Sequence, residues 1–336
     1  MMHPINVMHE LLFSGVKPTS TPHLGNYIGA LKQWAEIQHR YRCFFCIVDL
    51  HAITVAQDPE LLRERTLEIA AIYLAIGLDP ERCTFFVQSE VKEHAELGWI
   101  MGTLAKMSEL ERMTQYKDKA KTKGENVGAG LFNYPSLMAA DILLYDTTVV
   151  PVGEDQLQHV ELTRTLARRF NTQFGETFVV PQALVQKVGA RIMSLQDASK
   201  KMSKSDESAA GTIMLTDEAD AIRKKIMRAV TDSGDEISYD AVERPAISNL
   251  LTIFHHATGK PIKEIQKEFA GKGYADFKRA LAEAVIVMLD PIQKKLAEFK
   301  RRPDELKAIL DKGRDQAQEL AKTKMTLVRQ KVGLGR

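Results

Sequence analysis

The sequence contains few cysteines and no long apolar run. Its three cysteines are Cys43, Cys46 and Cys83, too few for a disulfide framework in a chain of 336 residues and typical of a reducing compartment. Cys43 and Cys46 have no partner pair for a zinc site, and their apolar neighbours favour a core strand. No segment approaches the ~18–20 apolar residues that a membrane span needs, and residues 1–10 do not resemble a signal peptide. We therefore expect a cytoplasmic protein.

A strong net charge is also absent, because 46 basic residues are balanced by 44 acidic ones. The charge is nevertheless uneven. Thirteen of the basic residues and only six of the acidic ones lie within residues 291–336, so the C-terminal segment is basic and the remainder is acidic. This pattern is consistent with a polyanionic partner, but long helices with lysine-rich solvent faces explain it equally well.

Apolar segments typical of buried parallel strands alternate with helical segments through the first two thirds of the chain. Strands are expected at residues 11–15, 42–49, 84–88 and 147–152, with an extended piece at 177–181, and helices at 24–40, 58–77, 91–113, 135–145 and 154–170. This alternation predicts an α/β fold, a Rossmann-like doubly wound parallel sheet with right-handed crossovers.

Strand patterns stop near Gly211, and helical patterns alone follow at residues 216–230, 245–258, 274–300 and 303–331. We expect a first domain over residues 9–211 and an all-helical domain over residues 212–300. A C-terminal helix within residues 301–336 is expected to pack back on the first domain.

A lysine-rich segment, K-M-S-K-S at residues 201–205, follows the last strand pattern. Lysine is a common phosphate ligand, and the small polar residues around these lysines suit a mobile loop. Taken alone, the segment is better explained as a solvated basic loop.

A second polar element, H-L-G-N at residues 23–26, begins the helix after the first strand. The loop before it lies at the carboxyl edge of the predicted sheet, where ligands bind. Gly15 allows a close approach of backbone to ligand. His23 and Asn26 lie one turn apart and could hydrogen-bond phosphate oxygens together with the free N–H groups of the helix start. Alone, this motif is no more than a capped helix start.

Together, the two elements resemble the class I aminoacyl-tRNA synthetases. The resemblance implies a Rossmann-type catalytic domain that uses ATP and Mg²⁺ in a two-step ligation. An amino-acid carboxylate attacks the α-phosphate of ATP, and the terminal adenosine of tRNA then accepts the aminoacyl group.

The middle of the chain is similar to the tryptophanyl-tRNA synthetase family. The matching segments are F-S-G at 13–15, C-I-V-D with H-A-I-T at 46–54, Y-P-S-L-M-A-A-D-I-L-L-Y at 134–145, V-V-P-V-G-E-D-Q at 149–156 and G-A-R-I-M-S-L at 189–195. Tyrosyl enzymes are the alternative within the class, but their usual G-S-D-Q is G-E-D-Q here. A non-catalytic paralogue that binds tRNA or a nucleotide is the alternative outside it.

The resemblance implies a tryptophan site around Asp141. Indole has one N–H donor and no acceptor, which a carboxylate can read, and Met138 lies on the same helix face as Asp141 and fits against a ring. Tyr134 and Gln156 would hold the α-ammonium group. The remaining pocket lining is expected from Gly15, Val48, His51, Val150 and Val152.

The resemblance likewise implies an ATP site with no metal ligand from protein side chains. Its expected residues are Ser14, Gly15, Val16, Lys17, His23, Gly25, Asn26, Gly153, Glu154, Asp155, Ile192, Lys201, Met202, Ser203, Lys204 and Ser205. The catalytic group is expected to be Lys204 and Lys201 with His23, Asn26 and Lys119, the lysines holding the leaving pyrophosphate.

Two residues depart from the family pattern. The first is Lys17, because a glutamine is common at this position. We expect Lys17 to pair with the substrate carboxylate or the α-phosphate and to change the sensitivity to tryptophan analogues, although a lysine that points outward is equally compatible with the sequence. The second is Leu50, which also stands where a glutamine is common, a difference that is compatible with packing alone.

The expected partners are L-tryptophan, ATP and tRNA(Trp), without a membrane, in a homodimer. The helical domain is expected to meet the anticodon stem. Its candidate phosphate contacts are Lys294, Lys295, Lys300, Arg301 and Arg302.

Overall fold

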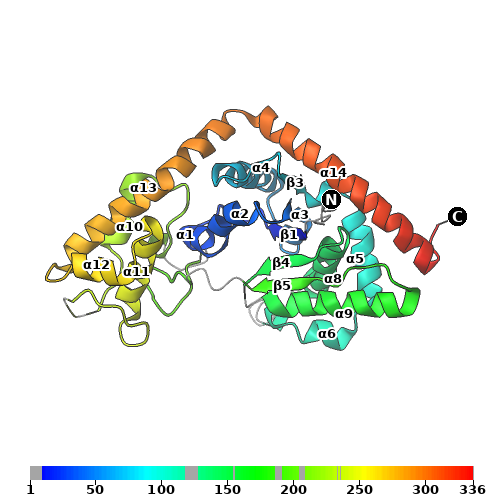
Figure 1. Ribbon diagram of the computed structural model, residues 1–336, viewed down its shortest axis with the longest axis horizontal. Coiled ribbons are helices and arrows are strands. Elements are labelled where there is room, and N and C mark those ends of the chain that lie inside the picture. The colour runs from blue at the N-terminus through cyan, green and yellow to red at the C-terminus, as the bar shows by residue number, and fades with distance from the viewer. Residues whose placement is uncertain are drawn as a thin grey trace, which may run out of the picture.

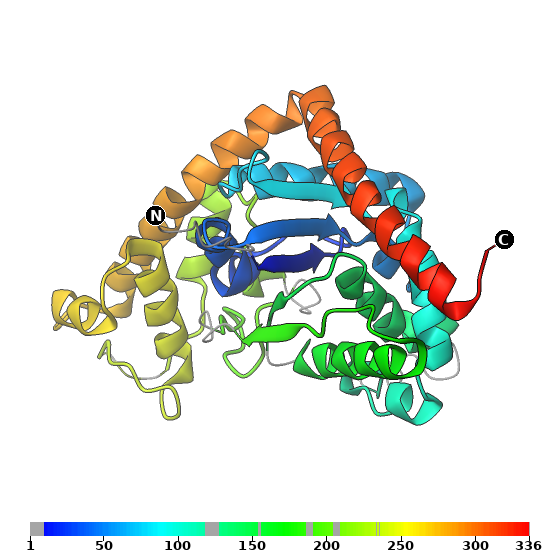
Figure 2. The same cartoon turned by 45° about the vertical axis from the view of Figure 1, so that its right-hand side comes forward.

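The computed structural model describes residues 10–117, 128–153, 156–185, 191–203, 209–232, 234 and 236–335. Within these residues, five strands form one parallel sheet in the order β3-β2-β1-β4-β5, shown in Figure 2. The strands are β1 (Leu11–Val16), β2 (Arg42–Ile47), β3 (Cys83–Val87), β4 (Val149–Val152) and β5 (Gln182–Val185). The predicted doubly wound α/β fold is confirmed.

Both faces of the sheet are buried, because side chains alternate between two apolar cores. In β2, Cys43, Phe45 and Ile47 belong to one core, whereas Phe44 and Cys46 belong to the other. This alternation explains why the strand is apolar throughout. The cysteines are buried and form no disulfide, in agreement with the prediction of a core strand for Cys43 and Cys46.

Helices cover both faces of the sheet. Their bounds are α1 (Leu24–Asn26), the π-helix η1 (Tyr27–Leu31), α2 (Lys32–Ile37), α3 (Asp49–Ala52), α4 (Pro59–Ala75), the 3-10 turn η2 (Gln88–Glu90), α5 (Glu93–Leu104), α6 (Met107–Glu111), α8 (Ala129–Leu143) and α9 (Leu157–Phe174). Residues of α4 belong to the first core, whereas α5, α8 and α9 contribute to the second. The sheet is therefore packed against helices on both of its faces.

Several predicted boundaries are wrong. Pro135 does not open its helix but lies inside α8, which already begins at Ala129. The expected helix over residues 91–113 is two helices, because Lys106 is extended and caps α6. The fifth strand is Gln182–Val185 rather than 177–181, since these later residues pair with β4.

The C-terminal part is helical, as predicted, and continues from the 3-10 turn η4 (Ala209–Gly211). Its helices are α10 (Ala219–Met227), α11 (Pro245–Thr258), α12 (Ile262–Glu268), α13 (Tyr274–Lys300) and α14 (Pro303–Val332). The sequence did not predict α12. Figure 1 shows α13 and α14 meeting at an angle, with α10, α11 and α12 grouped along the outer part of α13. No helix of the described residues is long and apolar enough to cross a membrane.

The helix α14 lies against β3, α4 and α5. The Oγ1 atom of Thr84 donates to Gln316 Oε1 at 3.1 Å, and Arg329 Nε donates to Glu96 Oε1 at 2.7 Å. The last helix therefore covers β3, the edge strand of the sheet.

Candidate active site

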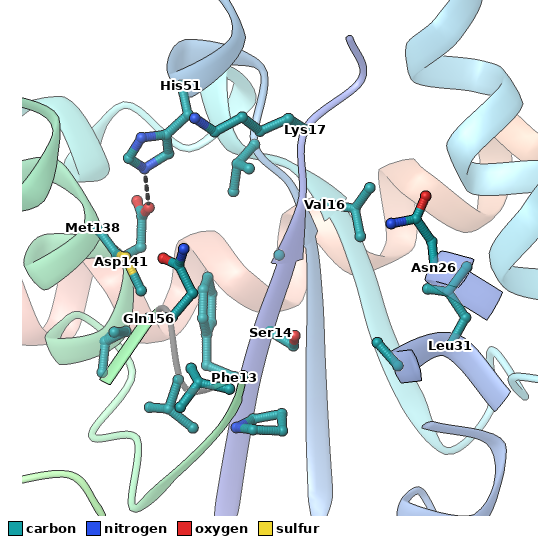
Figure 3. A pocket seen from close by; sticks show the side chains of 18 of the residues that line it. Phe13, Ser14, Val16, Lys17, Asn26, Leu31, His51, Met138, Asp141 and Gln156 are labelled. Carbon is teal, nitrogen blue, oxygen red and sulfur yellow. Dashed lines mark hydrogen bonds and ion pairs between the residues drawn. The ribbon is translucent and has the colours of Figure 1, made fainter. Parts of the chain in front are cut away.

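A cavity of about 440 Å³ lies at the carboxyl ends of β1 and β4. Strand order reverses between these neighbours, since the chain continues from β1 to β2 on one side while β4 and β5 lie on the other. Doubly wound sheets bind ligands at such a switch point. Figure 3 shows His51, Met138, Asp141 and Gln156 on one side of the end of β1, and Asn26 and Leu31 on the other. The cavity can therefore hold two ligand parts that meet over β1.

Most of the predicted substrate residues line this cavity. They are Ser14, Gly15, Val16, Lys17, Asn26, Val48, His51, Tyr134, Met138, Asp141, Val150, Val152, Gly153 and Gln156. The structure thus brings together the complete predicted tryptophan set and part of the predicted ATP set.

The other predicted residues fall into two groups. His23, Gly25, Ile192, Lys201, Met202 and Ser203 are not part of the lining. Lys119, Glu154, Asp155, Lys204 and Ser205 lie outside the described residues. The sequence did not single out the lining residues Phe13, Ser20, Pro22, Ala30, Leu31, Trp34, Gln115, Ile142 and Pro151.

Gly15 forms part of the cavity floor at the end of β1. A Cβ atom added there would lie 2.8 Å from Val48 Cγ1, closer than side chains tolerate. Only glycine fits here without displacing Val48, and a residue without a side chain allows a ligand to approach the backbone closely.

The H-L-G-N motif caps its own helix. The His23 N–H donates to Asn26 Oδ1 at 3.1 Å, and the Asn26 N–H donates to His23 Nδ1 at 3.3 Å. This reciprocal capping box satisfies two N–H groups at the helix start. It also fixes the two side chains, of which Asn26 alone lines the cavity.

The lysine-rich segment begins beside this helix start. Met202 is buried, and its Cβ lies 3.4 Å from the position of a Cβ added to Gly25. The Met202 N–H donates to the Ile192 carbonyl at 3.0 Å, and Thr212 Oγ1 donates to the Ser203 carbonyl at 2.7 Å. Hence Lys201–Ser203 is held next to His23–Asn26, as their pairing in one site requires.

The Asp141 carboxylate is the most enclosed polar group of the cavity, with 2% of the residue exposed. His51 Nε2 lies 2.8 Å from its Oδ2 atom. Its Oδ1 atom accepts from Gln88 Nε2 at 2.7 Å and lies 2.6 Å from His94 Nδ1. Burial by itself raises the pKa of Asp141, but His51 and His94, which hydrogen-bond the carboxylate, outweigh burial and hold the pKa well below its usual value.

Sequence reasoning assigned no role to Gln88, His94 or Tyr145. Gln88 and His94 contact Asp141, and Tyr145 contacts His94. The one available signal was weak: Gln88 is a polar residue at the end of a predicted apolar strand, at the ligand-binding edge of the sheet. His94 and Tyr145 lie within helical patterns, where nothing in the spacing separates a functional side chain from a core one.

Tyr134 lies at the cavity wall with its hydroxyl 2.6 Å from His159 Nε2. Burial raises the pKa of Tyr134 to about 12, so its phenol keeps its proton at neutral pH. Gln156 lines the same cavity from the start of α9. Both residues are therefore placed to offer polar atoms to a ligand that occupies the cavity.

Known proteins resemble the chain over nearly its whole length. The family described as tRNA synthetases class I (W and Y) matches residues 9–290. The tryptophan–tRNA ligase of Oceanobacillus iheyensis is 52% identical over 327 residues, 97% of this chain and 99% of that protein. The crystal structure of tryptophanyl-tRNA synthetase from Mycoplasma pneumoniae is 37% identical, with a TM-score of 0.89 over 98% of this chain and 99% of that one. The Campylobacter jejuni enzyme complexed with ADP and tryptophan is 38% identical, with a TM-score of 0.85 over 96% and 100%.

Proposed function

Because this chain belongs to the class I tRNA synthetase family for tryptophan and tyrosine, we propose that its cavity ligates tryptophan to tRNA(Trp). In the first step, the tryptophan carboxylate attacks the α-phosphorus of ATP and pyrophosphate leaves. In the second, a hydroxyl of the terminal adenosine attacks the aminoacyl carbonyl, and AMP leaves with the bonding electrons of the mixed anhydride.

The observation that carries this proposal is the buried carboxylate of Asp141 at the cavity wall. An ionised carboxylate only accepts hydrogen bonds, and indole offers one N–H donor and no acceptor. Apolar walls from Met138, Val48 and Val150 suit the ring. Phenylalanine has no N–H to donate to this carboxylate, and a site that reads its substrate through a buried hydrogen bond rejects such an analogue by large factors, ~10⁴–10⁵ in strong cases.

We assign the Asn26 side of the cavity to ATP. Tyr134 and Gln156 would hold the α-ammonium group, and the bare backbone of Gly15 would let the carboxylate and the α-phosphate meet over β1. This placement does not need a covalent intermediate on the protein, since the reaction depends on positioning and charge stabilisation.

The leaving pyrophosphate is assigned to lysines. Lys201 is held beside His23–Asn26, and we propose that it acts with Lys204 and Lys119. Mg²⁺ would enter on the phosphates of ATP, where it screens their charge. We propose that no protein side chain is a ligand of this ion.

For tRNA, we propose a catalytic domain of residues 9–211, an anticodon-binding domain of residues 212–300 and a C-terminal helix within residues 301–336. The candidate contacts Lys295 and Arg301 are exposed, whereas Lys294 pairs with Asp290 at 2.7 Å and Lys300 with Glu68 at 2.9 Å. Lys295 and Arg301 would therefore reach a phosphate without breaking these two ion pairs.

We propose that the enzyme works in the cytoplasm as a homodimer. Trp99 on α5 and Met107 on α6 expose 72% and 64% of their surface, and large apolar side chains in the open are typical of an interface. Analytical ultracentrifugation of Trp99→Glu tests this surface, and a variant that remains as dimeric as the parent contradicts it.

The decisive experiment is amino-acid-dependent exchange of pyrophosphate into ATP. Exchange with tryptophan alone supports the proposal, exchange with tyrosine alone assigns a tyrosyl enzyme, and no exchange assigns a non-catalytic paralogue. Asp141→Asn should raise the KM for tryptophan at least about tenfold, or ~1.4 kcal/mol. Asp304→Asn, an exposed carboxylate on α14, serves as the matched control.

A further inference from the structure

We propose that His94 is a positioning residue for amino-acid selection, which holds the Asp141 carboxylate in the orientation that reads the indole N–H. This inference rests on the proposed function. His94 belongs to α5, is fully buried and is absent from the cavity lining. It therefore acts on the substrate only through Asp141.

Both ring nitrogens of His94 are engaged by polar groups. Nδ1 lies 2.6 Å from Asp141 Oδ1, and Nε2 lies 2.7 Å from the Tyr145 hydroxyl. A buried chain thus runs from Tyr145 through His94 to Asp141. Its three members come from α5, from α8 and from the turn directly after α8, so the chain forms only when the tertiary fold is complete.

The positions of the protons follow from chemistry. The ionised Asp141 carboxylate offers only lone pairs, so Nδ1 of His94 carries the hydrogen and donates. In the neutral ring, Nε2 is then an acceptor, and the Tyr145 hydroxyl donates to it. Burial raises the pKa of Tyr145 well above its ordinary value, so this phenol retains the proton that it donates. Tyr145 therefore selects the tautomer of His94 that holds Asp141.

The two carboxylate oxygens of Asp141 have different partners. Oδ1 is contacted by both Gln88 Nε2 and His94 Nδ1, as many partners as it has lone pairs. Oδ2 contacts one side chain among the described residues, that of His51. An indole N–H can thus be accepted by Oδ2, beside His51 or in its place. His94 and Gln88 decide which oxygen faces the substrate.

Aromatic packing keeps His94 in place. Its ring centre lies 5.9 Å from that of Phe86 and 5.5 Å from that of Tyr145, and Tyr145 also contacts Phe44 at 5.1 Å. The donor to Asp141 is thereby fixed to the sheet by rigid rings. Such a support is what a site needs in order to hold a functional group within a fraction of an ångström.

The test compares tryptophan with 3-benzothienylalanine, in which sulfur replaces the indole N–H. Pyrophosphate exchange gives kcat/KM for both. His94→Leu removes the donor, and we expect the preference for tryptophan to fall at least tenfold, through KM more than through kcat. His94→Asn can still donate to Asp141 from the Nδ1 position and should restore most of the preference. Tyr145→Phe, which frees the tautomer, should lower it about threefold.

The matched control is Phe85→Leu, a change in the same strand whose ring enters the opposite core and contacts Phe45 and Tyr73. It should lower the melting temperature while leaving the ratio between the two substrates unchanged. A His94→Leu protein that loses activity toward both substrates equally overturns the proposal. If His94→Leu does not fold, an unchanged ratio in both His94→Asn and Tyr145→Phe overturns it instead.

The two levels of inference fail in different ways. A wild-type protein without tryptophan-dependent exchange overturns the proposed function, and the assignment of His94 with it. A wild-type protein that uses tryptophan, together with variants of unchanged ratio, overturns the role of His94 alone.

Discussion

The ammonium group of Lys17 lies 5.4 Å from the centre of the Tyr134 ring. Both residues line the cavity, Lys17 from the segment directly after β1 and Tyr134 from α8, and Figure 3 shows the Lys17 side chain reaching toward His51. A cation over an aromatic face is held by ~0.5–1 kcal/mol even where water has access. The structure therefore disfavours a lysine that points outward, and places its charge in the cavity.

Lys17→Gln should raise the KM for tryptophan about five- to tenfold, or ~1–1.4 kcal/mol, because the substrate carboxylate loses a cation. The same variant should change inhibition by tryptophan analogues. Exchange kinetics with a competing analogue measure both quantities, and Lys92→Gln, an exposed lysine before α5, is the control. If neither quantity changes, Lys17 has no role at the substrate.

Much of the fold could be predicted because the sheet is buried on both sides. Phe44 and Phe45 enter different cores, so an unbroken apolar run has one simple explanation, a central parallel strand. Pro135 misled because proline usually opens a helix, whereas here the turn before it continues α8 and buries Leu131. Packing of α8 on α5 offsets the backbone hydrogen bond that this proline removes.

The residues of the candidate site also divide into those that the sequence predicts and those that it does not. Asp141 and Met138 share one helix face, a local relation that spacing reveals. Gln88 and His94 reach Asp141 only because β3, α5 and α8 meet in the fold, and the sequence separations of 53 and 47 residues carry no period to read. Sequence reasoning therefore missed the residues that reach Asp141 only through tertiary contacts.

Lys204→Ala should lower the rate of tryptophan activation more than tenfold, or more than ~1.4 kcal/mol in the barrier. The lysine is proposed to meet charge that develops on the leaving pyrophosphate, so kcat should fall much more than the KM for tryptophan rises. Lys200→Ala is the matched control, because its exposed side chain already pairs with Asp197 at 3.4 Å. A loss below tenfold for Lys204→Ala, or an equal loss in both variants, assigns Lys204 a peripheral role.

Gly313→Ala should destabilise the protein, because it disturbs the packing of α14 on the sheet. A Cβ atom at this position would overlap the carbonyl group of Phe85 in β3, and neither backbone can yield without moving its element. Overpacking of this kind costs ~1–3 kcal/mol or more, so the melting temperature should fall by several degrees. The matched control is Gly102→Ala in α5, where an added Cβ would lie 3.4 Å from the Asn133 side chain. Its melting temperature should fall much less. Equal melting temperatures for the two variants mean that α14 does not pack tightly on β3.

His256→Asn should weaken the dependence of stability on pH below neutrality. Burial, with the nearby charges of His255 and Lys32, lowers the pKa of His256 to about 4, and Lys32 Nζ also donates to the His256 carbonyl at 3.0 Å. Below pH ~6.5 the unfolded chain protonates this histidine first, so its contribution to stability is present above pH ~6.5 and is lost as the pH falls toward 4.

Because His256 is half-buried, solvent screening reduces the effect to about 1 kcal/mol, roughly 2 °C in melting temperature. The fall between pH 7 and pH 4.5 should therefore be smaller in His256→Asn than in the parent, by this amount. His39→Asn, an exposed histidine, should follow the parent. If His256→Asn loses as much stability as the parent between pH 7 and pH 4.5, proton uptake by His256 is not coupled to folding. The contact between α2 and α11 then does not shield His256 from protonation.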